Sequence, residues 1–264
     1  MDAQDIAKLT RGAKVFDLGM ELTNAVPHFP THSPFMYQMI RQHGDMLYAE
    51  GTTAAVDIIC CPTHIGTHID GFGHFSKNGQ LCGGRPVAGN QDKMTGMKVH
   101  GMETVAPIVR RGVMLDVAAY RKEEIMKPQY LIEATELEET AKWAKVDIQP
   151  GDVVLVRTGY IKHWPKPAYA AVAGGFPGVS IGGARWLSEH GLFMGGSDNM
   201  TFEQVPQPAM PVHAHFLVEK GIHILEVANL DGLSQAKVYE FLFVSLPLKI
   251  VGATGCPVRP IAIV

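Results

Sequence analysis

Three histidines and an aspartate close together constrain this chain more than any other feature. The segment from His64 to Phe75 reads HIGTHIDGFGHF and holds His64, His68, Asp70 and His74. If it runs as an extended strand, residues of equal parity lie on one face, so these four side chains are expected to converge. Neutral imidazoles with a carboxylate suit a borderline divalent cation such as zinc or manganese. The segment therefore predicts a metal site.

The glycines of this segment support the same interpretation. Gly66, Gly71 and Gly73 permit close backbone approach and unusual dihedral angles, which a crowded site requires. A lone histidine is usually an ordinary core or surface residue. Three histidines and an aspartate at matched parity are much harder to explain in that way.

Length and composition indicate a folded protein with a sizeable core. The 264 residues suffice for one large domain, and 46% hydrophobic with 19% charged residues excludes a disordered chain. We expect a single domain over 1–264. The net charge is −3 and basic blocks are absent, so nucleic acid is not an expected partner.

The sequence also predicts a cytoplasmic protein. The segment Met1 to Lys14 has no apolar signal core, and apolar stretches such as Phe241 to Leu246 are too short to span a bilayer. The four cysteines form no CxxC pair, and we interpret them as buried free thiols in a reducing compartment.

Hydrophobic patterns predict a mixture of strands and helices. The expected helices cover 135–145, which opens with a capping box at Thr135, 180–190 and 211–220. Proline and glycine make 27–34 a loop. This mixture favours an α/β single domain. The expected strands cover 15–18, 53–61, 112–117, 152–157, 192–195, 222–227, 238–246 and 258–264.

Further ligands are expected from the C-terminal half. In the predicted strand 222–227, Glu226 shares a face with apolar residues, where a carboxylate is costly unless it is paired or bound to a cation. His223 has the opposite parity and is interpreted as structural. On the predicted helix, His213 and His215 lie about 200° apart, so both cannot face one site.

Two other carboxylates remain open. Asp198 and Glu203 flank a loop and could assist, although solvated side chains are the commoner explanation. Aromatic residues Phe29, Phe35 and Phe72 are expected to line a pocket for an aromatic substrate.

The residues resemble a known family. The form HxGTHxDxxxH is typical of the cyclase-like metal-dependent hydrolases, which include bacterial kynurenine formamidases and isatin hydrolases, and His64 to His74 matches every fixed position. The similarity continues through 16–18, His213, 221–226, 239–241 and 252–260. Two departures are Phe72, where kynurenine formamidases commonly have proline, and extra sequence around 79–101.

The resemblance implies a compact swivelling β/β/α fold, usually a homodimer or homotetramer, with one or two ions of manganese or zinc. It implies that His64, His68 and Asp70 bind metal and that His74 transfers protons. His213 and Glu226 match the distal positions that complete the site when two metals are present.

The implied activity is hydrolysis of a carbon–nitrogen amide bond by metal-activated water. The small-molecule substrate would be an aromatic formamide or a cyclic amide. One alternative is a non-haem iron oxygenase, because His68, Asp70 and His213 mimic a two-histidine, one-carboxylate triad. Another is a catalytically silent relative, which the complete ligand set and His74 argue against.

Overall fold

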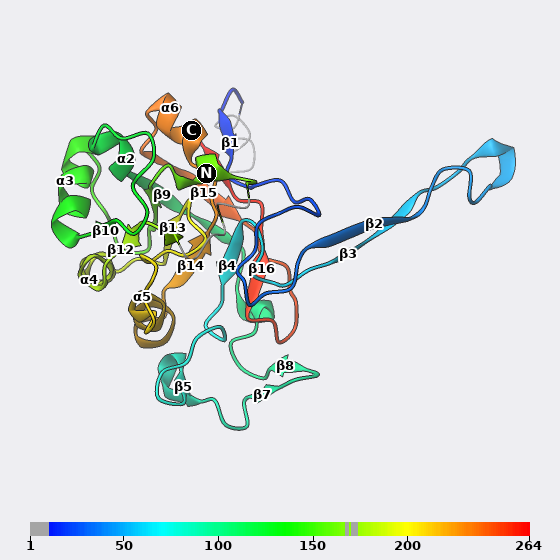
Figure 1. Cartoon of the computed structure of the whole chain (residues 1–264), viewed down its shortest axis with the longest axis horizontal. Helices are drawn as coiled ribbons and strands as arrows, with labels where there is room; N and C mark the ends of the chain where they lie inside the picture. Colours follow the sequence, from blue (N-terminus) through cyan, green and yellow to red (C-terminus); the bar gives the residue numbers. More distant parts are fainter. Residues whose placement is uncertain (1–10, 167–168, 170–173) are drawn as a thin grey trace.

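A nine-stranded sheet forms the centre of the chain, for which a computed structural model describes residues 11–166, 169 and 174–264 (Figure 1). The four central strands run parallel, and the strands on both sides of them pair in antiparallel fashion. In spatial order the strands are β1 (Val15–Asp17), β17 (Ile261–Ile263), β15 (Glu240–Ser245), β9 (Ile108–Asp116), β11 (Val153–Arg157), β13 (Met194–Ser197), β14 (His223–Glu226), β4 (His68–Asp70) and β16 (Gly255–Pro257).

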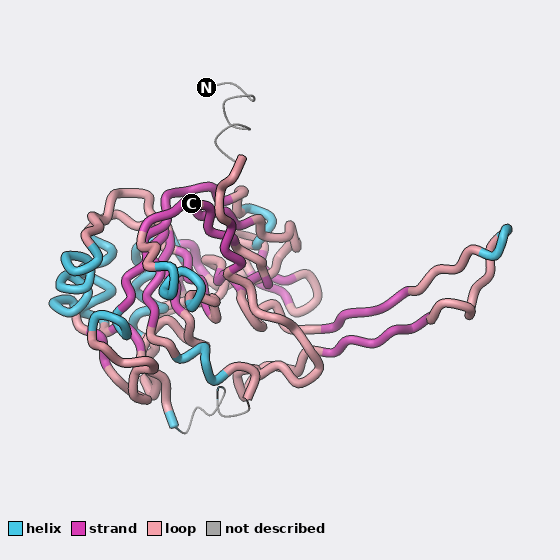
Figure 2. Tube along the Cα trace, turned by 90° about the horizontal axis from the view of Figure 1, so that it is seen from above, coloured by secondary structure: helices cyan, strands magenta, loops and turns pink. Residues whose placement is uncertain are grey.

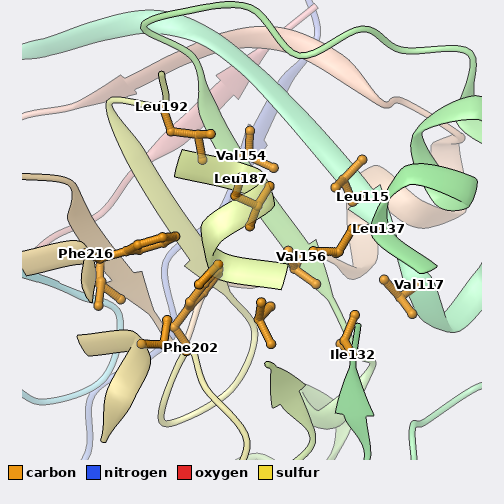
Figure 3. Close-up of a cluster of buried hydrophobic side chains, with 14 of the residues drawn as sticks. Leu115, Val117, Ile132, Leu137, Val154, Val156, Leu187, Leu192, Phe202 and Phe216 are labelled. Carbon is orange, nitrogen blue, oxygen red and sulfur yellow. The ribbon is translucent and has the colours of Figure 1, made fainter. Parts of the chain in front are cut away.

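Both faces of the central strands are buried. Along β11, Val154 and Val156 pack in one hydrophobic cluster, whereas Val153 and Leu155 pack in another. This alternation explains why the parallel strands read as continuous hydrophobic runs. Figure 3 shows the first cluster, to which helices contribute Leu137, Leu187 and Phe216 among others. These helices are α3 (Ala134–Ala144), α4 (Ile181–Glu189), α5 (Pro211–His213) and its π-helical continuation η7 (Ala214–Lys220).

Shorter elements complete the body. The helices α2 (Val117–Tyr120) and α6 (Asp231–Ala236) each follow a strand of the sheet. Two small hairpins occupy the segment that the sequence marks as extra, β5 (Gln80–Leu81) with β6 (Arg85–Pro86) and β7 (Gln91–Asp92) with β8 (Gly96–Met97). The remaining elements are the strand pair β10 (Leu131–Ile132) and β12 (Gly178–Val179), and the 3-10 turns η2 (Cys82–Gly84), η3 (Met102–Thr104) and η4 (Tyr160–His163).

A long hairpin leaves the body. It consists of β2 (Met36–Arg41), β3 (Val56–Cys60) and a tip containing η1 (Ala49–Gly51). We call residues 36–60 the arm; Figures 1 and 2 both show it projecting far from the sheet. Every residue of β2 and β3 is exposed. The expectation of uniformly buried cysteines is therefore wrong for Cys60, which lies on this arm.

The mixed α/β class expected from the sequence is confirmed, but the parity argument for the metal segment is wrong in its extent. Only His68–Asp70 is a strand, so alternation aligns His68 with Asp70 and no other pair. The predicted strand 53–61 exists as β3 but belongs to the arm rather than to the main sheet. Loops, not strand periodicity, bring His64 and His74 to the site.

Three further expectations need correction. Helix α3 begins after Glu133, and no side chain caps it, so the capping box at Thr135 does not form. Strand β13 covers 194–197 rather than 192–195, because the chain first leaves the turn at Gly191. Strand β16 lies outside the expected strands, because its sequence Gly255-Cys256-Pro257 carries little strand signal. Within the described parts of the chain, none of the helices has the length and apolar character to cross a membrane.

Candidate metal centre

Two adjacent strands supply the centre of the site. Glu226 of β14 pairs with His68 of the antiparallel β4, and Asp70 follows two residues later on the same face as His68. The Nε2 atom of His68 lies 3.5 Å from Asp70 Oδ1 and 3.4 Å from Glu226 Oε2. All three side chains are buried. Strand register therefore brings one imidazole and two carboxylates together away from water.

A backbone carbonyl fixes the orientation of His68. Its Nδ1 lies 2.8 Å from the carbonyl oxygen of Gly66, which can only accept a hydrogen bond. In the neutral ring, Nδ1 therefore carries the proton and Nε2 presents a lone pair toward the two carboxylates. Such an outer hydrogen bond is the usual way in which a metal-binding histidine is oriented.

His64 and His74 approach Asp70 from loops on either side of β4. Nδ1 of His64 is 2.7 Å from Asp70 Oδ1, and its Nε2 is 2.9 Å from Oγ1 of Thr254. The backbone N–H of His74 donates to the carbonyl of Gly71, which turns the chain back. The two rings stack with centroids 3.9 Å apart.

Glycines make this close packing possible. A Cβ atom at Gly255, which pairs with Asp70 across β16 and β4, would collide with the His64 ring. A Cβ atom at Gly71 would lie 2.8 Å from Met102 Sδ, and one at Gly73 2.9 Å from Met97. The glycines of the motif therefore serve close approach, as the sequence predicts.

His213 enters from the helix on the other side of the site. Its Nδ1 lies 2.6 Å from Glu203 Oε1, which also accepts the His213 backbone N–H at 2.9 Å. Nε2 then points inward, 3.2 Å from Glu226 Oε1 and 3.7 Å from Asp70 Oδ2. His215 faces away from the site and bonds to Glu219, as the helical angle predicts.

The donor atoms fall into two overlapping sets. His64, Asp70 and His74 form one, and His68, Asp70 and Glu226 form the other, each with ligand atoms within 4.8 Å of one another. Asp70 belongs to both, and its Oδ2 is buried without a hydrogen-bond partner. A buried acceptor of this kind is costly unless a cation or donor satisfies it. The residues thus fit one divalent cation, or two that share Asp70.

Electrostatics at the site depend on burial and on the neighbouring rings. Burial opposes ionisation of Asp70, but His74 and His64 outweigh it and lower the pKa of this carboxyl. Burial and then the charge of Asp70 raise the pKa of Glu226. Burial, together with nearby histidines, lowers the pKa of His74 to about 3. The His74 ring is therefore uncharged at neutral pH in the metal-free protein.

His213 behaves differently. Burial would lower its pKa, but hydrogen bonds to Glu203 and Glu226 raise the pKa to about 10. A cation that binds at Nε2 must therefore displace a proton. The ion pairs around His213 explain why a histidine that is 3% exposed is tolerated there.

A cavity of about 210 Å³ opens onto these residues. One part of its wall is the loop that precedes the arm, including His28, Phe29 and His32. The Nδ1 atom of His32 is buried and has no hydrogen-bond partner. Other wall residues are Ile65, Phe75, Met200, Met210 and Val227. The cavity therefore combines apolar walls with the ionisable cluster.

Only one of the three expected aromatic wall residues contacts this cavity. Phe29 lines it. Phe35 instead packs in a small core with Val26 and Ile65. Phe72 stacks on His223, with ring centroids 4.0 Å apart, in a different hollow. Phe35 and Phe72 therefore do not line this cavity, because each ring packs against other residues.

Two carboxylates are more deeply buried than their sequence context predicts. Asp198 and Glu203 are fully buried rather than solvated. Asp198 accepts hydrogen bonds from Thr158 and Gly159, and burial raises its pKa to about 6. Glu203 holds His213. The sequence carries no pattern that marks His32 as a wall residue of the cavity.

Comparison with known proteins identifies the family. The family model "Cyclase", described as "Putative cyclase", matches residues 16–204, well over half of the chain. The chain belongs to this cyclase family. It is 24% identical over 247 residues to the kynurenine formamidase of Bacillus thuringiensis subsp. konkukian, covering 93% of this chain and 95% of that protein. The corresponding enzyme of Bacillus anthracis is 23% identical over 253 residues, with 94% and 97% covered.

Solved cyclase-family structures share the fold. The crystal structure of a novel cyclase superposes with a TM-score of 0.89 at 26% identity, covering 99% of this chain and 91% of that one. Isatin hydrolase A from Ralstonia solanacearum gives a TM-score of 0.76 at 23% identity, with 99% and 96% covered. The similarity therefore extends over the whole sheet, including the strands that carry the site.

Proposed function

We propose that this cyclase-family protein is a metal-dependent hydrolase that cleaves a carbon–nitrogen amide bond in a small aromatic formamide or lactam. The observation that carries the proposal is that two sets of possible metal ligands share Asp70 and lie beside a small cavity. The curated relatives are named for a formamide and the structural relatives for isatin, a cyclic amide. Both names denote hydrolysis of an amide attached to an aromatic ring.

The residues have separable roles in this proposal. A divalent cation, when bound by His64, His68, Asp70, His213 and Glu226, would polarise a carbonyl and lower the pKa of a water molecule. His74 is placed to accept a proton at a ring nitrogen and to return it to the leaving nitrogen. The main-chain N–H of Phe202 donates to Glu226 Oε1 at 3.1 Å and holds that carboxylate in place.

The cavity supports a small substrate. Its volume of about 210 Å³ is below the roughly 300–1,000 Å³ of typical ligand pockets. Phe29 offers an apolar contact to an aromatic ring, and the unpartnered His32 Nδ1 offers a hydrogen bond to a polar substituent. Phe72 lines a different hollow from this cavity.

The experiment is metal reconstitution followed by a small substrate panel. Protein stripped by a chelator is reloaded with manganese, zinc or ferrous iron and assayed under air and argon with N-formylkynurenine, isatin and an aromatic lactone. We expect hydrolysis of one of the two amides with manganese or zinc under argon. Full hydrolysis by metal-free protein, or loss of every activity on this panel with all three metals, would contradict the proposal.

The oxygenase alternative makes the opposite prediction in the same assay. A non-haem iron oxygenase using His68, Asp70 and His213 would need both ferrous iron and oxygen. The proposed hydrolase is favoured because Glu226 and two further histidines surround this triad, which such an oxygenase would not require.

We also propose a cytoplasmic location. All four cysteines are free, which agrees with a reducing compartment.

A further inference from the structure

Thr254 lies directly before strand β16, beside the metal centre. Its main-chain carbonyl accepts the N–H of Gly71 at 2.8 Å. The next residue, Gly255, pairs with Asp70 across β16 and β4, which lie side by side (Figure 1). These contacts involve only the backbone and do not depend on the side chain at position 254. Strand register therefore places that side chain next to the segment that carries the expected metal ligands.

Both ring nitrogens of His64 have a hydrogen-bond partner. Nδ1 is 2.7 Å from Asp70 Oδ1, and Nε2 is 2.9 Å from Thr254 Oγ1. A carboxylate accepts hydrogen bonds and cannot donate them. In the neutral ring of the metal-free protein the proton is therefore on Nδ1, and the Thr254 hydroxyl must donate to the lone pair of Nε2.

The outer partner of His64 is of a different kind from those of His68 and His213. His68 bonds to the main-chain carbonyl of Gly66, and His213 bonds to the carboxylate of Glu203. Both of these partners only accept, so each keeps a proton on Nδ1 and directs Nε2 toward the site. A hydroxyl both donates and accepts, so it is compatible with either tautomer of His64.

A cation held by His64 and Asp70 requires the opposite tautomer. The ring nitrogen that faces Asp70 is Nδ1, and a metal bond at this atom needs a lone pair in place of the proton. The proton must leave Nδ1 and Nε2 must carry one instead, so the ring stays neutral. The hydroxyl of Thr254 accommodates this change by turning, without movement of the backbone.

We propose that Thr254 is a positioning residue for the metal centre, whose hydroxyl donates to His64 in the metal-free protein and accepts from it when a cation is bound. The hydrogen bond is stronger in the metal-bound state, because the cation makes the Nε2–H a charge-assisted donor. Loss of the hydroxyl therefore weakens metal binding more than it weakens the metal-free fold. The proposal rests on the metal binding of the proposed function and adds a residue that does not itself touch the cation.

The metal affinity of three variants tests the proposal. Thr254→Val keeps the shape of the side chain but removes the hydroxyl, and it should weaken zinc binding about tenfold, the lower end of the range for outer hydrogen-bond partners. Thr254→Ser restores the hydroxyl and should remain within a fewfold of wild type. Thr140→Val is the matched control, because the buried Thr140 hydroxyl bonds to the main-chain carbonyl of Glu136 within helix α3. Competition with a chelator measures all of them.

NMR of protein labelled with ¹⁵N-histidine gives a readout that a purely structural role would not change. The chemical shifts of the ring nitrogens distinguish the protonated nitrogen from the one with a lone pair. The His64 signals are assigned by comparison with His64→Asn. The proton should be on Nδ1 in metal-free protein and on Nε2 in zinc-loaded protein. A proton that stays on Nδ1 with zinc bound would overturn the proposal.

This proposal and the proposed function can fail separately. Wild-type protein that binds neither manganese, zinc nor iron would contradict both. Zinc binding by wild type with an equal affinity in folded Thr254→Val would overturn only the role of Thr254. If Thr254→Val fails to fold, as judged by circular dichroism, the tautomer of wild-type His64 with and without zinc still decides the question.

Discussion

His68 and Glu226 lie opposite each other on β4 and β14, with Nε2 of His68 3.4 Å from Oε2 of Glu226. This pairing joins a segment near residue 70 to one near residue 225 and fixes which residues of β14 face the site. His223, of opposite parity, points to the other side, where it stacks on Phe72 and its Nδ1 donates to the main-chain carbonyl of Asp70.

Replacing these two residues should therefore have unequal effects. Glu226→Gln removes a charge between His68 and His213 and should weaken metal binding by at least about 10–100-fold. His223→Gln should leave metal affinity within a fewfold of wild type, although it will lower thermal stability. Metal titration with a competing chelator measures both, and equal losses would show that the separation of Glu226 from His223 by strand register is wrong.

Substitutions of His74 and of His68 should distinguish a role in proton transfer from a role in metal binding. If His74 moves protons without holding the cation, His74→Asn should keep the metal and lose about 10²–10⁴ in turnover. His68→Asn should instead empty the site. Metal analysis of both purified variants decides the matter: a His74→Asn protein as depleted as His68→Asn would make His74 a ligand, which its proximity to Asp70 and His64 also permits.

Glu203 should act through His213. Its carboxylate accepts the Nδ1 proton of His213 at 2.6 Å and so aims Nε2 at the site. Glu203→Gln should lower metal affinity by about 10–100-fold. The change should also lower the pKa of His213 in the metal-free protein, because a hydrogen-bonded carboxylate raises it. NMR titration of the ring measures that shift, and the exposed Glu240→Gln serves as the control. An unchanged His213 pKa would refute the role.

Glu219 should make stability depend on acid pH. Hydrogen bonds from Lys77 and then His215 lower its pKa from 4.5 to about 2. Because the folded pKa is depressed, the stabilisation is present above pH 4.5 and is lost as pH falls toward 2. Glu219 is 41% exposed, so the gain is at most about 1 kcal/mol. Urea unfolding should show wild type more stable than Glu219→Gln at pH 6, with a smaller difference at pH 3. A constant difference would contradict this assignment.

Removing the metal should destabilise the fold as well as abolish activity. Without a cation, Asp70 and Glu226 remain buried carboxylates in contact with the same small cluster. A ligand that binds only the native state stabilises it by about 2.7 kcal/mol at one hundred times its Kd. Scanning calorimetry should show a lower Tm after chelation and recovery with manganese or zinc. An identical Tm in both states would argue against occupancy at Asp70.

Several features of the site follow from the sequence because they are local. The spacing of His68 and Asp70 places them on one strand face, and the helical angle between His213 and His215 leaves only one facing inward. The parity of Glu226 and His223 likewise separates a site residue from a packing residue. These relationships depend on the backbone period alone, which hydrophobic patterns reveal.

Other features were decided only by tertiary structure, because they depend on loops and on contacts between distant segments. His64 and His74 reach Asp70 through turns that permit close packing only next to glycines such as Gly255, almost two hundred residues away. Glu203 contacts His213 because the loop between them folds back, and no sequence pattern predicts this contact. The strand 53–61 has the composition of a core strand, yet the fold places it on the exposed arm. Hydrophobicity predicts a buried strand, whereas only the three-dimensional arrangement shows that the described part of the chain leaves this strand exposed.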